Sequence, residues 1–257
     1  MKYIKPLLKF LSLTLLALVI GLAMIPYLFK NKVLEYLKND INANLNAVVS
    51  FADVDLSVFK SFPDLRISID SLSLKGIEEF DNIVLYKADR SSFDVNLPSL
   101  FAKDIVPKIN TIVLDNPEIN IIVLDTIHAN YLIMKDTTES EASKFMLRLQ
   151  HYAINNGTIT YQDNTMPVFI RIDNFNHSGS GDFTQDIFDL KTQSKASKLY
   201  VKYDGTTYIN NVAIDLDAGI NVNFPESKYT LKDNVLKFNE LDMKGSGFVQ
   251  LQEDDII

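Results

Sequence analysis

The side chains of this 257-residue chain that could perform chemistry do not fall into the spacing of a recognisable site. Asp53, Asp55 and Ser57 match the first three ligand positions of a calcium-binding EF-hand loop. However, Val58 stands where that loop requires glycine, and Asp64 stands where it requires a bidentate glutamate. Alternating acids on the solvated face of a strand explain this spacing better than a calcium site does.

Two glycine pairs, Gly179-Ser180-Gly181 and Gly245-Ser246-Gly247, resemble phosphate-binding loops only superficially, because neither completes a nucleotide-binding motif. We predict that both are bends or bulges. The histidines, His128, His151 and His177, have no metal-ligand spacing, and the chain has no cysteine. The sequence therefore predicts no catalytic residue, no metal site and no cofactor.

Charge is distributed unevenly along the chain. The net charge is -8, but the region beyond position 38 carries 19 basic and 32 acidic residues, a balance of -13. Such an acidic segment would be repelled by phosphate backbones, so we expect no nucleic-acid partner. Six lysines lie within residues 1–38 and bracket an apolar run, where anionic lipid headgroups would attract them.

The apolar run from Phe10 to Phe29, which includes Leu16 and Ile20, contains no charged residue. As a helix it would span about 30 Å, the thickness of the hydrocarbon core of a bilayer. The competing interpretation is a cleaved signal peptide, but the run is too long and lacks a small-residue cleavage site. We therefore predict a single transmembrane anchor over residues 10–29.

Basic residues predict the orientation of this anchor. Lys2, Lys5 and Lys9 make residues 1–9 a basic cytoplasmic leader and favour an N-in topology, although Lys30 and Lys32 weaken the asymmetry. Residues 30–48 show helical periodicity and predict a juxtamembrane amphipathic helix. That helix would either cap the end of the following sheet, which we favour, or lie on the membrane surface.

From Phe51 onward the period changes to two, which predicts strands, and we assign residues 49–257 to one β-rich region. Leu65, Ile67 and Ile69 mark the apolar face of one strand, and Ile170 and Ile172 mark that of another. A change of parity after position 70 predicts a bulge near Ser71. The further predicted strands cover residues 82–89, 91–97, 109–115, 117–125, 130–135, 145–153, 157–162, 167–175, 182–192, 198–204, 207–216, 218–224, 228–238 and 242–250.

Strands at this spacing, without helices between them, indicate a mainly β fold built from hairpins and meanders. We predict an elongated, largely antiparallel curved sheet whose apolar face must be covered by a second layer, by itself or by lipid. The last residues follow a strand pattern without a closing turn, so we expect the chain to be cut short at its C-terminus.

Several segments, in this order, resemble the start of AsmA family proteins. After the basic leader and the two helices come Val54-Asp55-Leu56, Ser61-Phe62-Pro63-Asp64-Leu65, Ile67-Ser68-Ile69, Leu72-Ser73-Leu74-Lys75-Gly76, Ile112-Val113-Leu114-Asp115-Asn116-Pro117-Glu118-Ile119 and Ile154-Asn155-Asn156-Gly157-Thr158-Ile159-Thr160-Tyr161-Gln162-Asp163. The resemblance covers nearly the whole chain. Members are usually much longer, so it implies that this chain is an N-terminal portion.

The resemblance also implies a bacterial inner-membrane protein with a β-rich body in the periplasm. AsmA-like proteins are similar to chorein-type bridge proteins, whose curved sheet forms a groove with an apolar floor. They are associated with phospholipid passage toward the outer membrane and with outer-membrane integrity. Residues Leu65, Ile67, Ile69, Ile170 and Ile172 are then the candidate lipid-facing residues.

Two other classes of function compete with lipid binding. The first is a non-enzymatic assembly or scaffolding factor for outer-membrane or periplasmic proteins, which would use exposed strand edges. The second is a periplasmic enzyme whose residues converge only in space. A lipid groove requires a continuous apolar concave face, whereas a scaffold requires open edges and can have a filled core.

Overall fold

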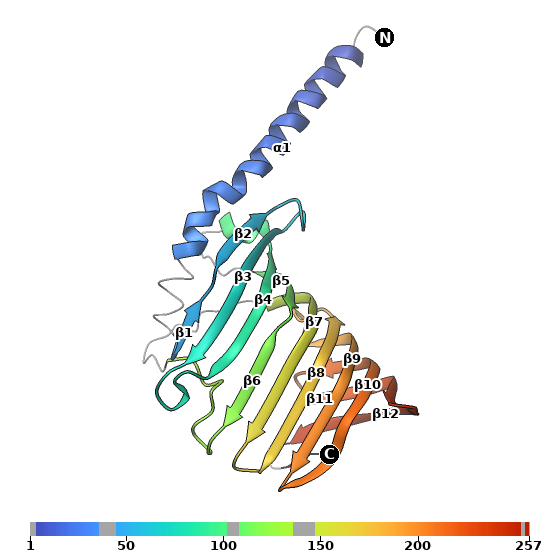
Figure 1. Ribbon diagram of the computed structural model, residues 1–257. Coiled ribbons are helices and arrows are strands. Elements are labelled where there is room, and N and C mark those ends of the chain that lie inside the picture. Colours follow the sequence, from blue (N-terminus) through green and yellow to red (C-terminus); the bar gives the residue numbers. More distant parts are fainter. Residues whose placement is uncertain (1–3, 36–44, 102–107, 136–146, 253–254, 257) are drawn as a thin grey trace.

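A long N-terminal helix is joined to one end of a large curved sheet in the computed structural model (Figure 1). The structure describes residues 4–35, 45–101, 108–135, 147–252 and 255–256. Within these ranges the fold is mainly β, as the alternating sequence pattern predicts, and the sheet has 13 strands.

Helix α1 (Ile4–Glu35) contains the whole predicted anchor and continues six residues beyond Phe29. The predicted second helix over residues 30–48 is therefore wrong at both ends, because its first residues belong to α1 and its last residues belong to strand β1. Residues 30–35 extend α1, because nothing between Lys30 and Glu35 interrupts a helix, and residues 36–44 lie outside the described part. Ala47 and Val49 alternate with exposed neighbours in strand β1, so a period of two prevails there.

The other described elements follow in chain order. They are β2 (Asp53–Ser57), β3 (Leu65–Gly76), η2 (Glu78–Phe80), β4 (Val84–Val95), η3 (Leu97–Phe101), β5 (Ile109–Asp115), β6 (Glu118–Val123), β7 (Leu147–Asp163), β8 (Val168–Ser180), β9 (Ile187–Tyr203), β10 (Thr206–Asn223), β11 (Lys228–Phe238), β12 (Leu241–Gln252) and β13 (Asp255–Ile256).

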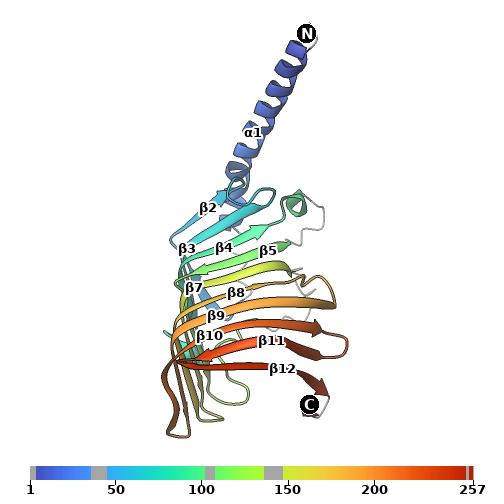
Figure 2. The ribbon, with the colours of Figure 1, turned by 90° about the vertical axis from the view of Figure 1, so that its right-hand side faces the viewer.

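The strand order is β1-β3-β4-β5-β7-β8-β9-β10-β11-β12-β13. Strand β2 also pairs with β3, and β6 lies between β4 and β7. Most pairs are antiparallel, but β5 and β6 both run parallel to β7. Figure 2 shows that the strands step away from α1 in order, with β2 nearest to the helix and β12 far from it.

Four asparagines interrupt the alternation of the strands, and two of them, Asn116 and Asn156, lie in turn signals of the sequence. Asn116, Asn156, Asn174 and Asn211 have left-handed backbone conformations, with φ between 49° and 54°. Asparagine tolerates this conformation better than most residues do. The Asn156 amide donates to Asn116 Oδ1 (2.8 Å), and the Asn174 amide donates to Ser197 Oγ (2.9 Å). Asn116 lies between β5 and β6, whereas Asn156, Asn174 and Asn211 change the side-chain parity within β7, β8 and β10 without ending the strand. The two strands predicted over residues 145–153 and 157–162 are therefore one curved strand, β7.

Ser71 has the same effect in β3. Its φ of 55° coincides with the predicted change of parity between Ile69 and Leu72. The pairing with β4 nevertheless keeps its register across this point, from Asp70 with Arg90 to Leu72 with Ala88. A left-handed residue, rather than a residue inserted into one strand alone, therefore changes the parity.

A closed hydrophobic core forms where α1 meets the first strands. We call it the core cluster, and its buried members are Val49, Val54, Leu56, Val58, Leu65, Ile69 and Leu72. One side of the C-terminal half of α1 packs against the core cluster, through Leu22, Ile25, Phe29, Val33 and Leu34. Lys30 of α1 also forms an ion pair with Asp53 of β2 (3.5 Å). These contacts fix the helix to the sheet.

Candidate functional site

One row of paired residues crosses the whole sheet from β3 to β12. The register joins, in turn, Ile69, Ser91, Leu114, Ile154, His177, Ser194, Leu216, Leu236 and Met243. Residues paired in this way project from the same face of a sheet. We call this side the inner face. Its row is mostly apolar, and its polar members are small or neutral.

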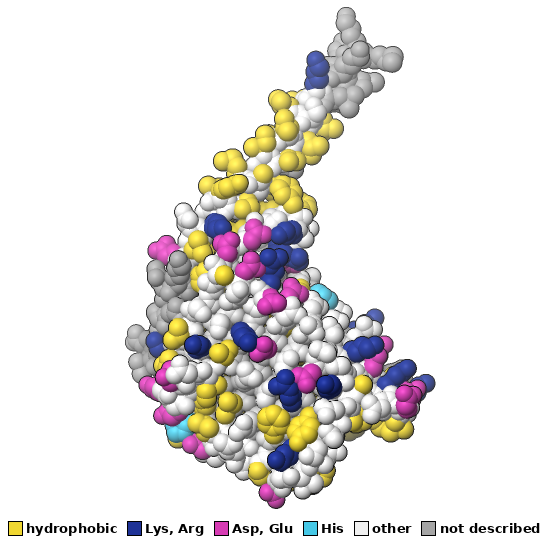
Figure 3. Space-filling model, in the orientation of Figure 1, with side chains coloured by type: hydrophobic (Ala, Val, Ile, Leu, Met, Phe, Trp, Pro, Cys, Tyr) yellow, Lys and Arg dark blue, Asp and Glu magenta, His cyan; other side chains and the backbone are white. Residues whose placement is uncertain are grey.

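The neighbouring row projects from the opposite side, the outer face, and is polar throughout. It consists of Asp70, Arg90, Asp115 and Asn155, followed after the bend by Asn176, Lys195, Asp215, Lys237 and Asp242. Arg90 pairs with Asp70 at 2.7 Å, and Lys195 pairs with Asp215 at 3.5 Å. Charged side chains are spread over the sheet in Figure 3, whereas hydrophobic ones crowd along α1. The sheet thus has one apolar and one charged face.

The five candidate lipid-facing residues all project from the inner face. Leu65, Ile67 and Ile69 share the parity of the row described above. Ile172 is joined through Ile159, Ile119 and Tyr86 to Leu74, and Ile170 lies two residues before it in β8. Leu74 and Ile67 both pack against the core cluster, which places the two groups on the same side of the sheet.

These residues differ in what covers them. Leu65 is 0% exposed and Ile69 is 4% exposed, because α1 packs against the core cluster to which they belong, while β1 and β2 pair with β3 beside them. Ile67 is half-buried at the margin of the core cluster. Ile170 and Ile172 are half-buried as well, and β8 makes its main contacts with the adjacent strands β7 and β9. Protein therefore fills the inner face near α1 and leaves it more open at β8.

Aromatic rings continue the inner face across β7, β8 and β9. Tyr152 lies 5.3 Å from His177, and Phe183 lies 4.7 Å from Phe188, measured between ring centroids. Gly179 is buried beneath the ring of Tyr152, where a Cβ atom would overlap that ring. Gly181 similarly lies against the ring of Phe188. Gly179 thus lies within the paired strand β8 and not in the predicted bend or bulge, and the first glycine pair leaves room for aromatic rings.

His177 and Ser194 form a pair that the sequence did not indicate. Their Nδ1 and Oγ atoms are 2.8 Å apart, and burial lowers the pKa of His177, which favours the neutral ring. Both residues lie in the middle of paired strands, where the ladder between β8 and β9 uses the backbone N–H groups. An oxyanion site requires free N–H donors, and the backbone N–H groups here are already used in the ladder. The geometry therefore suits a histidine and a serine that only hydrogen-bond to each other. Among the described residues, no acidic or histidine cluster could hold a metal ion.

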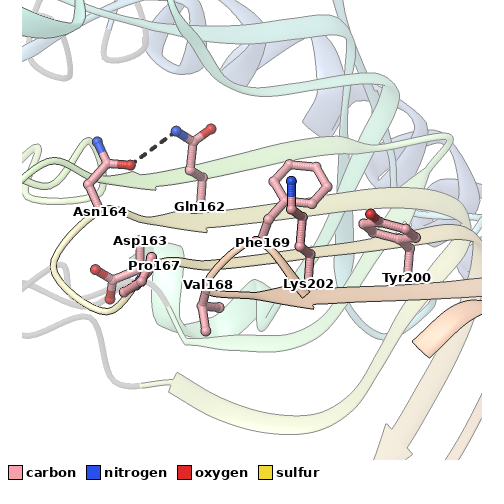
Figure 4. Close-up of a pocket in the computed structure, with 9 residues that line it drawn as sticks. Gln162, Asp163, Asn164, Pro167, Val168, Phe169, Tyr200 and Lys202 are labelled. Atoms are coloured by element: carbon pink, nitrogen blue, oxygen red, sulfur yellow. Dashed lines mark hydrogen bonds between the residues drawn. The ribbon is translucent and has the colours of Figure 1, made fainter. Parts of the chain in front are cut away.

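A cavity of about 580 Å³ lies at the strand ends near the β7–β8 and β9–β10 turns (Figure 4). Phe169 and Tyr200 meet edge to face in its wall, with ring centroids 6.0 Å apart. Gln162 donates to Asn164 Oδ1 (3.1 Å) at one end, and Lys202 crosses beside Phe169. Phe169 projects from the outer face, whereas Val168, which also lines the cavity, shares the parity of Ile170, so the cavity lies at the ends of the strands and is not confined to one face.

The predicted anchor residues of α1 also fall into two groups. Phe10, Leu16 and Ile20 are 69%, 56% and 53% exposed on the free part of the helix. Phe29 packs against the core cluster instead. The most apolar 18 residues of the stretch Lys9–Glu35 have a mean hydropathy of 2.2, and the helix is long enough to cross a membrane.

Comparison of the chain with protein-family models, with curated proteins and with solved structures gives no match. The resemblance to AsmA proteins therefore remains a prediction from the sequence, and the function is argued from the geometry of the inner face.

Proposed function

We propose that this protein is anchored in the bacterial inner membrane by α1 and binds phospholipid acyl chains on the inner face of its sheet. The N-terminus lies in the cytoplasm and the sheet in the periplasm. The curved sheet acts as a groove of the chorein type, which conducts phospholipid toward the outer membrane and supports the biogenesis and integrity of that membrane.

The observation that carries this proposal is the continuity of the inner face from the core cluster to β12. Ile69 is 4% exposed in β3, whereas Met243, in the same row, is 40% exposed in β12. An acyl chain against such a surface gains about 0.8 kcal/mol for each CH₂ group removed from water. The outer face is charged and therefore favours contact with water, while the inner face contacts lipid. Binding of this kind requires no catalytic residue.

The test compares neighbouring positions of β8 that project from opposite faces. A photoreactive amino acid is placed at position 170 or 172 on the inner face, or at position 171 on the outer face, in the full chain. We expect phospholipid to crosslink from positions 170 and 172 and not from Arg171. Equal crosslinking from all three positions, or none from the inner face, would contradict lipid binding.

An alternative is an assembly or scaffolding factor for outer-membrane proteins. The observation that favours it is strand β12, whose second edge pairs with β13 only at Leu251 and Gln252 among the described residues. An extended peptide could add to the remaining edge by β-augmentation. This function predicts crosslinks to protein from the edge of β12 and none to lipid from position 170.

A further inference from the structure

The loop between β2 and β3 presents two aromatic rings to the surroundings. Phe59 is 61% exposed and Phe62 is 64% exposed, although the adjacent Val58 is completely buried. Large apolar side chains that are exposed together on an ordered surface often mark a contact with a partner or a membrane. We call residues 58–64 the aromatic loop.

Hydrogen bonds hold the aromatic loop in one shape. The N–H of Lys60 donates to Ser57 Oγ (3.3 Å), and the N–H of Asp64 donates to the Ser61 carbonyl (2.8 Å). Lys60 Nζ also contacts Asp55 at 2.9 Å, and Asn110 donates to Asp64 Oδ2 at 2.7 Å. The exposure of the two rings therefore results from a fixed loop geometry.

The aromatic loop lies beside the apolar helix. Val58 and Leu65, at its two ends, belong to the core cluster, against which Leu22 and Ile25 of α1 pack. Figure 1 shows this loop rising alongside the lower part of α1. Leu22 lies seven residues before Phe29, which is about 10 Å along a helix. The loop therefore reaches the level of the last turns of the predicted membrane span.

We propose that the aromatic loop inserts Phe59 and Phe62 into the membrane leaflet from which α1 emerges. Aromatic side chains concentrate at the boundary between headgroups and acyl chains, and a neighbouring lysine suits the phosphate level. Together with α1, the loop would hold the first strands of the sheet against the lipid surface. This inference rests on the membrane anchoring in the proposed function.

The test uses tryptophan fluorescence, because the chain contains no tryptophan of its own. The full chain is reconstituted in vesicles of phosphatidylethanolamine and phosphatidylglycerol as single variants Phe59→Trp and Phe62→Trp. We expect blue-shifted emission, quenching by lipids brominated near the carbonyl group and protection from aqueous acrylamide. Tyr208→Trp is the matched control, because Tyr208 is 68% exposed on β10, away from α1. It should be quenched by acrylamide alone.

A second control separates the two proposals. Leu16→Trp, in the free part of α1, should be quenched by brominated lipid if the helix is inserted. If Leu16→Trp is quenched by lipid but both loop variants are quenched by acrylamide as strongly as Tyr208→Trp, the insertion of the loop is refuted and the anchor stands. If Leu16→Trp is also open to acrylamide, the anchor is refuted, and the loop proposal with it.

Discussion

Gly179 illustrates how a single missing side chain shapes the inner face. A Cβ atom at this position would overlap the ring of Tyr152, whereas a Cβ atom at Gly247 would meet nothing within 4 Å. We expect Gly179→Val to destabilise the protein by about 1–3 kcal/mol, as overpacking usually does. Gly247→Val should change stability by no more than about 0.5 kcal/mol. Thermal unfolding of the full chain in detergent checks both values, and equal effects would contradict the packing of Tyr152 on Gly179.

Asp163 provides a dependence on pH at the turn between β7 and β8. Its carboxylate accepts hydrogen bonds from the Thr165 hydroxyl (2.6 Å) and the Tyr161 hydroxyl (2.9 Å), and the Thr165 hydroxyl contributes most to lowering its pKa to about 2. Because this pKa lies below the ordinary 3.8, the stabilisation is present above pH 3.8 and is lost as the pH falls toward 2.

The variant Asp163→Asn removes that titration. We expect it to be less stable than the parent at a pH of about 6, with a smaller difference at about 2.5, where the parent carboxylate is partly protonated. Urea unfolding of the parent and the variant at both pH values measures this difference in stability. The other carboxylates titrate in the same way in both proteins, so their contributions cancel when the two are compared. A difference that does not change with pH would rule out a role for the charge of Asp163.

At the scale of elements, the left-handed asparagines hold the bend of the long strands. Asn156 has a φ of 54° and donates to Asn116. Both Asn156→Ala and Asn156→Gly lose that hydrogen bond, but only glycine adopts this φ without a steric cost. We therefore expect the alanine variant to be less stable than the glycine variant by about 1–2 kcal/mol. Denaturant unfolding of the two variants tests this, and equal stability would show that the backbone relaxes instead.

The same asparagines explain where the sequence predicted the strands well and where it did not. The boundaries of β5 and β11 agree with the predicted residues 109–115 and 228–238. Strand β7 was predicted as two strands, because Asn155-Asn156-Gly157 is a turn signal in most settings. Its neighbours β5, β6 and β8 keep the ladder paired on both sides of the bend. This pairing depends on residues distant in sequence, so local patterns could not reveal it.

For the whole molecule, alternation predicted which side chains share a face but not what lies over that face. Leu65 and Ile170 look alike in sequence, as apolar residues that are each followed by arginine and then by isoleucine. Leu65, however, belongs to the core cluster against which α1 packs, whereas β8, which carries Ile170, has its main contacts with the neighbouring strands β7 and β9. The difference in coverage arises because α1 packs on the sheet near β3 and does not extend over β8. The sequence likewise did not predict the parallel pairing of β5 and β6 with β7, because this pairing depends on how the chain connects β6 to β7.

This difference between Leu65 and Ile170 gives the last prediction. Leu65→Asp places an unpaired carboxylate in a closed core and should cost about 4 kcal/mol or more, enough to unfold many proteins. Ile170→Asp, on a half-open surface, should cost about 1–2 kcal/mol, because water can reach the new charge. It should also reduce the phospholipid that co-purifies with the full chain, since a charge then lies among the side chains that contact acyl groups.

The matched control is Arg171→Asp, which places the same charge on the outer face of the same strand. It should leave the amount of bound phospholipid unchanged. Unfolding in detergent and native mass spectrometry of the three variants separate the possibilities. If Ile170→Asp is as destabilising as Leu65→Asp, the inner face is a filled core at β8 and has no space for lipid. If Ile170→Asp folds and retains the parent's phospholipid, acyl chains do not bind at this part of the sheet.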